Sequence, residues 1–359
     1  MIYNNTTGPL NGTLGSPGQN IPVIGTLQSI GQDIVARLAS GPVTLHVKAS
    51  TVSEIRTTRN VIADTAAGDP DRKMVIGAHL DSVNQGPGIN DNGSGTATIL
   101  EIAEQFAARD ITPRNQVRFV WWGAEELGLL GSRYYVGQLS AAEKAQHAAN
   151  LNFDMVGSPN YVRFVYDGDN SKFPVGPGAA AGPDGSGLIE AVFVQYFKNQ
   201  GLASEATPFS GRSDYGPFIE QGIPAGGLFT GAEGIKTAAQ AQTYGGTAGL
   251  AYDPCYHQAC DTFANNNDQG LDEMSDAAAH SAYTFALTRA EIQNGAALKP
   301  GTQTPDGDND GSGTAGGGGL HDDHDHAVAS RAGVQRRATA KRLAAKRRAL
   351  RYRGPQAVR

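Results

Sequence analysis

The sequence predicts an α/β protein with a mixed, mostly parallel central sheet and helices on both faces. Three observations predict this class: short continuous apolar runs typical of buried strands, amphipathic segments of helical length, and the alternation of the two along the chain. Alternation favours parallel pairing because each crossover helix packs back onto a face of the sheet. The 359 residues are 39% hydrophobic, which is enough for a substantial core.

The elements are predicted in chain order. Residues 27–40 form a helix that ends at the sequence SGP, and residues 43–63 alternate like two antiparallel strands. A continuous apolar strand at 73–80 precedes a glycine-rich loop. The elements that follow are a helix at 96–109, a strand at 117–122, a helix at about 126–138, strands at 150–156 and 161–166, a helix at 186–200, a strand at 222–230 and an amphipathic helix at about 268–293.

Charge divides the chain into two parts. The formal net charge is −6, but residues 327–359 carry 11 Lys or Arg and no acid, which leaves 18 basic against 35 acidic residues, or −17, before them. The acidic body argues against nucleic-acid binding there, while the basic tail suits polyanions. Residues 296–359 hold too few apolar side chains to offset chain entropy, so we expect them to be disordered.

Cys255 and Cys260 are the only cysteines. Five positions apart and with no other partner, they predict a local disulfide, which favours a location outside the cytosol; two unrelated free thiols are the alternative. No apolar stretch approaches the roughly 20 residues that cross a bilayer. The first 30 residues show no export signal.

Polar side chains follow the predicted carboxyl ends of the strands, where open α/β sheets bind ligands. Each one alone is typical of a cap, a turn or a structural hydrogen bond. Together, two imidazoles and several carboxylates at the ends of one sheet suit hydrolytic zinc. The residues are His79, Asp81, Asp91, Glu125, Glu126, Asp154, Tyr256 and His257.

Seven motifs, in order across residues 41–293, resemble those of the co-catalytic zinc aminopeptidases of the M28 family. The likeness is strongest to secreted leucine-type aminopeptidases of streptomycetes. The motifs are GAHLDSV, GINDNGSG, AEELGLLGS, NFDMVG, GRSDYGPF, GIPAGGLFTGAE and YDPCYHQACD. The resemblance implies a zinc-dependent enzyme that hydrolyses the N-terminal bond of peptides or proteins and prefers large hydrophobic first residues.

Carried over by position, the resemblance implies two zinc ions per chain. Asp91 would bridge the two ions. His79 and Asp154 would complete one site, and Glu126 and His257 would complete the other. The family's unusual cis peptide would follow the bridging aspartate.

The same resemblance implies roles for the residues around the ions. Glu125 would be the general base for the attacking water, and Tyr256 would donate to the tetrahedral oxyanion. Asp81 would orient the first histidine ligand. Arg212 would lie near the substrate, and Phe229 would form part of the pocket for the first side chain.

The resemblance also implies a division into domains. Residues 1–26 are similar to the closing part of a protease-associated insert domain, residues 27–295 to a zinc peptidase domain, and residues 296–359 form the tail, rich in Gly, Asp and His and then basic. The expected protein is secreted, with a start that is late or truncated. Asp272 and Asp276 resemble part of a calcium site, with a plain acidic helix face as the alternative.

Other functions stay open on the sequence alone. A dizinc carboxypeptidase or dipeptidase of this fold would need basic residues for a substrate carboxylate, and a glutaminyl cyclase would use one zinc ion. The chain would otherwise be a non-catalytic, truncated peptidase-like binding protein, or a polyanion binder that acts through its tail. A purely structural Tyr256 and an Arg212–Asp214 pair are the alternatives for two of the site residues.

Overall fold

The computed structural model describes residues 2–3, 23–50, 54–289 and 291–292. The predicted disordered tail at 296–359, with its basic segment for polyanions, and most of the predicted insert-domain remnant at 1–26 lie outside these ranges. No helix in the described ranges combines the length and the hydrophobicity that a membrane crossing requires.

The main sheet has seven strands in the described part of the chain, and it is mixed but mostly parallel, as predicted. Its antiparallel pairs are β3 with β5 and β7 with β9, and the other neighbours run parallel. In spatial order the strands are β3 (Val61–Asp64), β5 (Asn115–Trp122), β4 (Asp69–His79), β6 (His147–Phe153), β9 (Ala225–Phe229), β7 (Phe164–Tyr166) and β8 (Glu205–Thr207). A separate parallel pair joins β1 (Ile2–Tyr3) and β2 (Gly25–Thr26).

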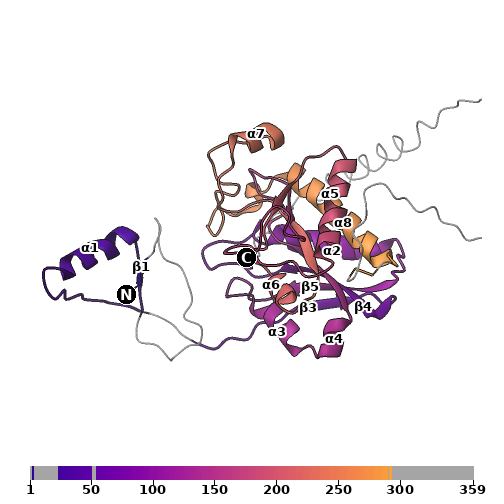
Figure 1. Cartoon of the computed structure of the whole chain (residues 1–359), viewed down its shortest axis with the longest axis horizontal. Helices are drawn as coiled ribbons and strands as arrows, with labels where there is room; N and C mark the ends of the chain where they lie inside the picture. Colours follow the sequence, from indigo (N-terminus) through magenta and orange to yellow (C-terminus); the bar gives the residue numbers. More distant parts are fainter. Residues whose placement is uncertain (1, 4–22, 51–53, 290, 293–359) are drawn as a thin grey trace, which may run out of the picture. The chain divides into compact units, whose positions relative to one another are not determined.

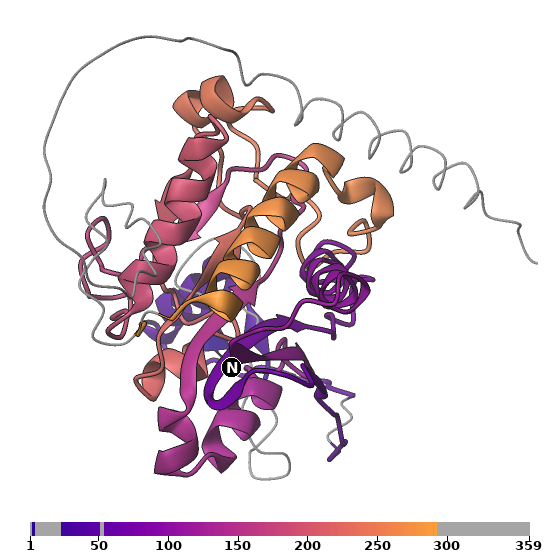
Figure 2. The same ribbon diagram turned by 90° about the vertical axis from the view of Figure 1, so that its right-hand side faces the viewer.

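Helices cover both faces of the main sheet, which confirms the predicted layers (Figures 1 and 2). One face carries α2 (Gly93–Ala108), α5 (Ser186–Asn199) and α8 (Asp268–Leu287). The other carries α3 (Leu130–Gln138) and α6 (Gly216–Glu220). The remaining helices are α1 (Gln28–Leu38), α4 (Ala141–Ala145), α7 (Ala238–Tyr244) and a 3₁₀ turn at Phe263–Asn265.

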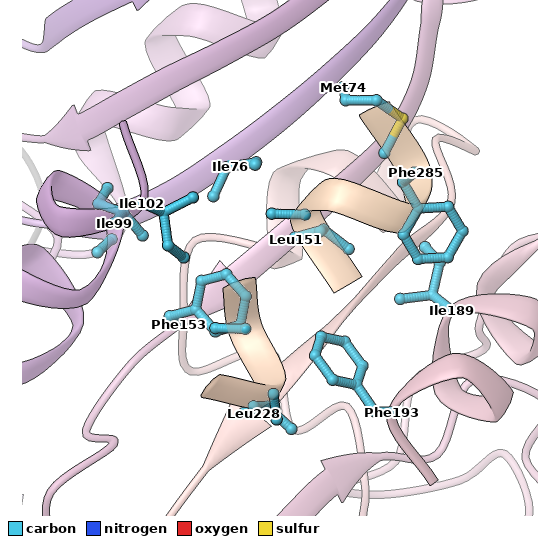
Figure 3. Packing of buried hydrophobic residues seen from close by; sticks show 14 of the residues in the cluster. Met74, Ile76, Ile99, Ile102, Leu151, Phe153, Ile189, Phe193, Leu228 and Phe285 are labelled. Atoms are coloured by element: carbon cyan, nitrogen blue, oxygen red, sulfur yellow. The ribbon is translucent and has the colours of Figure 1, made fainter. Parts of the chain in front are cut away.

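Alternation along the strands divides the core between the two faces. In β4, Met74 and Ile76 join the larger cluster under α2, α5 and α8, whereas Val75 joins the smaller cluster under α3 and α6. The larger cluster also holds Phe193 of α5 and Phe285 of α8, which come from distant parts of the chain (Figure 3). Each such side chain, when fully buried, contributes about 1.5–3 kcal/mol to folding.

The strand order brings three carboxyl ends together. From β4 the chain crosses through α2 to β5 on one side, and from β5 it crosses through α3 to β6 on the other side. The carboxyl ends of β5, β4 and β6 therefore meet at one edge, which is where ligands bind in such sheets. Gly95 in the first turn of α2 allows a close approach, because a Cβ there would clash with the Phe153 carbonyl oxygen at the end of β6.

Several element boundaries differ from the prediction. The two antiparallel strands predicted at 43–63 are wrong except for β3, because residues 43–50 and 54–60 pair with no strand and stay largely exposed. The helix predicted from about residue 126 begins at Leu130, after a tight turn. The last helix ends at Leu287 rather than 293, since Thr288 is extended. Short elements such as β8, α4, α6 and α7 give too little periodicity to be recognised in the sequence.

His147 at the start of β6 is a buried imidazole that supports this architecture. Its Nε2 accepts a hydrogen bond of 2.7 Å from the Tyr135 hydroxyl, and its Nδ1 donates to the Glu143 carbonyl at 2.6 Å. Burial lowers the pKa of His147 to about 4, and the positive charges of Lys73 and Arg118 add to the decrease. The neutral imidazole is therefore the form that the fold stabilises.

We expect this histidine to make the fold acid-sensitive. The unfolded chain takes up the proton near pH 6.5 and the folded chain only near pH 4, so the free energy of unfolding is fully retained above pH 6.5 and falls by up to about 3 kcal/mol as the pH decreases to 4. Denaturant unfolding of wild type and His147→Gln at pH 7.5, 6, 5 and 4.5 measures this slope. The glutamine variant should lose less stability across this range; equal slopes in the two proteins would contradict the assignment.

Candidate metal centre and active site

Two clusters of imidazole and carboxylate groups lie at the carboxyl edge of the sheet. In the first, His79 Nε2 lies 3.2 Å from Asp91 Oδ1 and 3.2 Å from Asp154 Oδ1. In the second, His257 Nε2 lies 3.2 Å from Asp91 Oδ2 and 3.0 Å from Glu126 Oε2. Each oxygen of Asp91 faces one cluster, so this carboxylate joins the two.

Hydrogen bonds from the loop at residues 245–262, which we call the late loop, hold the loop that carries Asp91. The amides of Asn90 and Asp91 donate to the Asp261 carboxylate at 2.8 and 3.0 Å. The Asn90 side chain donates to Asp253 at 2.7 Å. The Asp91–Asn92 peptide is cis, at the position that the family resemblance implied. Residues about 170 positions apart thus fix the backbone beside the shared carboxylate.

A sharp turn after β5 separates the two adjacent glutamates. Ala124 has a left-handed backbone with φ of 58°, and the Glu125 carbonyl accepts from the amides at 128 and 129. The Asp81 carboxylate accepts from the amides of Glu125 and Glu126 at 2.9 and 3.2 Å. With the backbone held in this turn, Glu126 points at His257, while Glu125 Oε2 lies 4.0 Å from His79 Nε2.

The orientation of His79 depends on a backbone carbonyl. Its Nδ1 donates to the Asp81 carbonyl oxygen at 3.1 Å, which leaves the Nε2 lone pair directed at the carboxylates. The Asp81 carboxylate, expected to orient this ring, lies 3.8 Å from Nδ1 and binds the turn amides instead. Asp81 therefore positions both the imidazole and the glutamate turn, through different atoms.

The charges of the site are unbalanced in the protein alone. Burial raises the pKa of Asp91, but hydrogen bonds with His257 and His79 outweigh it and lower the pKa to about 2. Burial also lowers the pKa of His257, yet the bonds to Asp91 and Glu126 raise it to about 9. For Glu125, burial raises the pKa to about 10, with further increases from neighbouring carboxylates. Two histidines thus face four acidic groups, with Asp154 the fourth.

The donor set fits a pair of divalent cations. Each cluster offers one imidazole nitrogen and two carboxylate oxygens, and the donor atoms of each cluster lie within 4.8 Å of one another. Nitrogen and carboxylate oxygen are the ligands that hydrolytic zinc takes. Glu126 adds an independent sign, because its second oxygen is buried and has no hydrogen-bond partner in the described structure. A bound cation would satisfy that oxygen.

The clusters form the floor of a cavity of about 260 Å³, which we call the acidic pocket. Carboxylates of Asp91, Glu125, Glu126 and Asp154 line its floor, and Glu233 lies in its wall. The apolar part of the wall includes Tyr166, Pro208, Phe229 and Tyr252. Phe229 stacks on Phe164 with ring centroids 6.1 Å apart, and this contact holds its ring in the wall.

Arg212 and Tyr256 form a linked pair in the wall of the acidic pocket. The guanidinium donates to the Tyr256 hydroxyl at 3.0 Å and to Glu233 at 2.6 Å. The alternative pairing of Arg212 with Asp214 is wrong, since Asp214 is buried and accepts from Ser132. Burial raises the pKa of Tyr256, although Arg212 opposes the rise, so the phenol keeps its proton at neutral pH.

The loop that carries Tyr256 and His257 is closed by a disulfide between Cys255 and Cys260, which confirms the predicted pairing. The two rings stack with centroids 3.8 Å apart. Because the bridge encloses only four residues, it restricts the backbone that presents both rings to the pocket.

Some residues of the site were not recognised from the sequence. Glu233 binds Arg212, and Asp253 and Asp261 bind the loop that carries Asp91. All three lie in sequence motifs from which we assigned functions to other residues only. A third metal-capable group exists at Asp167, Asp169 and Glu190. Asp272 and Asp276, proposed for calcium, lie in α8 and belong to none of the metal-capable groups among the described residues.

Comparisons with known proteins identify the family of this chain. Residues 60–282 match the family model described as Peptidase family M28. An aminopeptidase of Pseudomonas aeruginosa is 50% identical over 250 residues, which cover 70% of this chain and 45% of that protein. Leucine aminopeptidase 2 of Trichophyton equinum is 45% identical over 287 residues, covering 80% of this chain and 57% of that protein. The chain therefore spans about half the length of the curated relatives it matches.

Solved structures show the same fold. The aminopeptidase from Aneurinibacillus sp. strain AM-1 matches with a TM-score of 0.60 at 27% identity, covering 82% of this chain and 65% of that one. BSAP, a zinc aminopeptidase from Bacillus subtilis, matches with a TM-score of 0.57 at 24% identity, covering 81% and 65%. The family model covers more than half of the chain, and its matched residues contain every candidate metal ligand. This chain belongs to peptidase family M28.

Proposed function

We propose that this protein is an aminopeptidase with two zinc ions, which removes large hydrophobic residues from the N-termini of peptides. The observation that carries the proposal is the acidic pocket, where two imidazoles and three further carboxylates surround a shared aspartate beside an apolar wall. The aminopeptidase names of the relatives support the reaction, and the leucine aminopeptidase name supports the preference. Zinc is supported by the donor set, and the Bacillus subtilis enzyme of the same fold is a zinc aminopeptidase.

His79, Asp91 and Asp154 would hold one ion, and Asp91, Glu126 and His257 would hold the other. Bound zinc supplies Lewis-acid polarisation of the scissile carbonyl and lowers the pKa of water in the site. The protein prepares the ligands through His79 Nδ1, which donates to a carbonyl, and through the hydroxyl of Ser213, which donates to Asp154.

Glu125 is the proposed general base. Its carboxyl lines the acidic pocket, but it belongs to neither cluster of donor atoms. Its Oε2 lies 4.0 Å from His79 Nε2. In the free protein its raised pKa keeps it protonated, and positive charge nearby favours the ionised form that accepts a proton. Glu125 would take the proton of the attacking water and deliver it to the leaving amine.

Tyr256 is the proposed oxyanion donor. Because its oxygen already accepts from Arg212, the phenolic hydrogen is free to donate to a substrate oxygen. Arg212 fixes this orientation, and Glu233 fixes Arg212. Donors held in place before the reaction stabilise developing negative charge without reorganisation.

The charge of the pocket favours a substrate amine over a substrate carboxylate. Asp154, and Glu125 once a nearby positive charge ionises it, would offer carboxylates to an α-ammonium group, while the guanidinium of Arg212 is paired with Glu233. A carboxypeptidase would need a free cation for the substrate carboxylate. Phe229 and Tyr252 would contact the first side chain. An extracellular location is part of the proposal, because the disulfide is typical of oxidising compartments.

The terminus that the site recognises can be tested with blocked peptides. We expect a leucine peptide with a free N-terminus to be hydrolysed and its N-acetylated form to resist cleavage, because acetylation removes the ammonium charge. Amidation of the C-terminus should change kcat/KM little. Mass spectrometry of the products measures both, and the reverse pattern would identify a carboxypeptidase.

Glu125→Gln should separate catalysis from metal binding. Removal of the proton acceptor should lower kcat for leucine p-nitroanilide by about 10²–10⁴-fold. Zinc content should stay at the wild-type value, since Glu125 is not a proposed ligand. Glu233→Gln is the matched control: it should retain far more activity than Glu125→Gln because it only loosens Arg212. Loss of zinc from the Glu125 variant would overturn the assignment of Glu125 as a base.

Metal content tests the two-ion proposal independently of activity. Wild type dialysed against trace zinc should hold about two ions per chain, as two-metal hydrolases do. Glu126→Ala should hold about one, because it removes a ligand from one cluster only. The exposed Glu104→Ala should match wild type. A wild-type content of one ion would favour the glutaminyl cyclase alternative.

A further inference from the structure

A second polar cavity, of about 370 Å³, lies beside the long loop after β9, and we call it the basic cavity. Its wall includes residues from the connection between β6 and β7 and from the segment around α7. Figure 1 labels α7. None of the proposed zinc ligands lines it. The residues are Pro159, Asn160, Tyr161, Arg163, Lys236, Thr243, Tyr244, Gly245, Gly246, Asn267 and Gln269.

Lys236 is the unusual side chain of the basic cavity. It is only 1% exposed, which is rare for a lysine. Its ammonium group carries three donors but makes one hydrogen bond among the described residues, to the Tyr161 carbonyl at 2.8 Å. The ring of Tyr161 lies 5.9 Å from Nζ and adds a weak cation–π contact. No carboxylate of the described chain lies within ion-pair distance of Nζ.

The neighbouring charges do not neutralise Lys236. Arg163 also lines the basic cavity, but its guanidinium is paired with Glu273 at 2.6 Å and donates to the Ala203 carbonyl. Burial lowers the pKa of Lys236, and the Arg163 cation lowers it further, while Glu205 opposes them. Glu205 itself accepts from Gln240. A buried ammonium group with unused donors is costly unless an acceptor reaches it.

Backbone hydrogen bonds hold the segment that carries Lys236. The amide of Lys236 donates to the Leu250 carbonyl at 2.9 Å, and its carbonyl accepts from Gly249 at 2.8 Å. The Asn160 side chain bonds both the amide and the carbonyl of Thr247. Lys236 therefore belongs to a hydrogen-bonded segment that lines a polar cavity.

We propose that the basic cavity binds a small oxyanion, with Lys236 as the charged ligand. Inorganic sulfate or phosphate has the size and the acceptor oxygens to satisfy the unused donors of the ammonium group. Gly246 lies so close to Nζ that a Cβ there would be 3.0 Å away, and because it is a glycine it offers the ammonium group no side-chain acceptor. The bound anion would tie the loop containing Lys236 to the β6–β7 connection.

Sulfate is the probe for this site. Full-length protein is titrated with millimolar sodium sulfate against sodium chloride of equal ionic strength, and labelled sulfate is measured by equilibrium dialysis. We expect one saturable site in wild type together with a higher Tm. Sulfate raises the Tm of folded proteins in general, so the criterion is the difference in Tm increase and in saturable binding between wild type and the variants. No saturable site in wild type would overturn the proposal.

Two pairs of variants locate the site. Lys236→Met should abolish saturable binding, whereas Lys198→Met, an exposed lysine of α5, should retain it. Thr243→Glu places a carboxylate in the lining of the cavity, where it should compete with sulfate for Lys236 and prevent saturable binding. The neutral Thr243→Gln should still bind sulfate. The Thr243 pair decides the question if Lys236→Met does not fold. Binding that survives in both Lys236→Met and Thr243→Glu would place the anion elsewhere, including the metal centre, and would refute the proposal.

Discussion

The shared carboxylate of Asp91 is the constraint around which the peptidase fold is arranged. Its two oxygens face two histidines that are far apart in the chain, His79 at the end of β4 and His257 in the last loop. Four buried or half-buried acidic groups crowd this point, and an uncompensated charge in such a place costs several kcal/mol. Bound cations would offset this repulsion, so the geometry that suits the proposed catalysis would also couple metal binding to the stability of the edge of the sheet.

The strand order of the sheet does not by itself determine the position of Asp91, because Asp91 lies in the loop between the end of β4 and the start of α2. The late loop completes the placement: Asp261 binds the two amides before the cis peptide, and Asp253 binds the Asn90 side chain. The disulfide then restricts the segment that carries Tyr256 and His257. The local cross-link and the long-range hydrogen bonds therefore act on one substructure, and loosening either one would disturb ligands of both clusters.

The sequence predicted the class of the fold, the central strands and the convergence of polar residues, because buried strands such as 73–80 and 117–122 carry strong apolar signals. The prediction was wrong or incomplete where the structure depends on which segments or atoms pair, because residue types alone do not specify these partners. The alternation at 43–63 suggested strands, but among the described residues of this range and its end only Val61–Asp64 finds a partner, in β5. The partner of His79 Nδ1 is likewise a carbonyl, which no residue type reveals. The Arg212–Glu233 pair joins positions 21 apart, with α6 and β9 between them, so no local pattern in the sequence indicates it.

The segment after β9 carries charges of opposite sign toward different spaces. Glu233 lies in the wall of the acidic pocket, whereas Lys236, three residues later, lies in the wall of the basic cavity. A single ligand cannot satisfy both, because the acidic pocket attracts cations and amines and the basic cavity attracts anions. An isolated antiparallel β-bridge between Ile235 and Ala251 joins the two ends of this segment. Glu233 and Lys236 therefore stay in their separate environments. The basic cavity is therefore better explained by a structural ligand that stabilises the loop than by an extension of the substrate site.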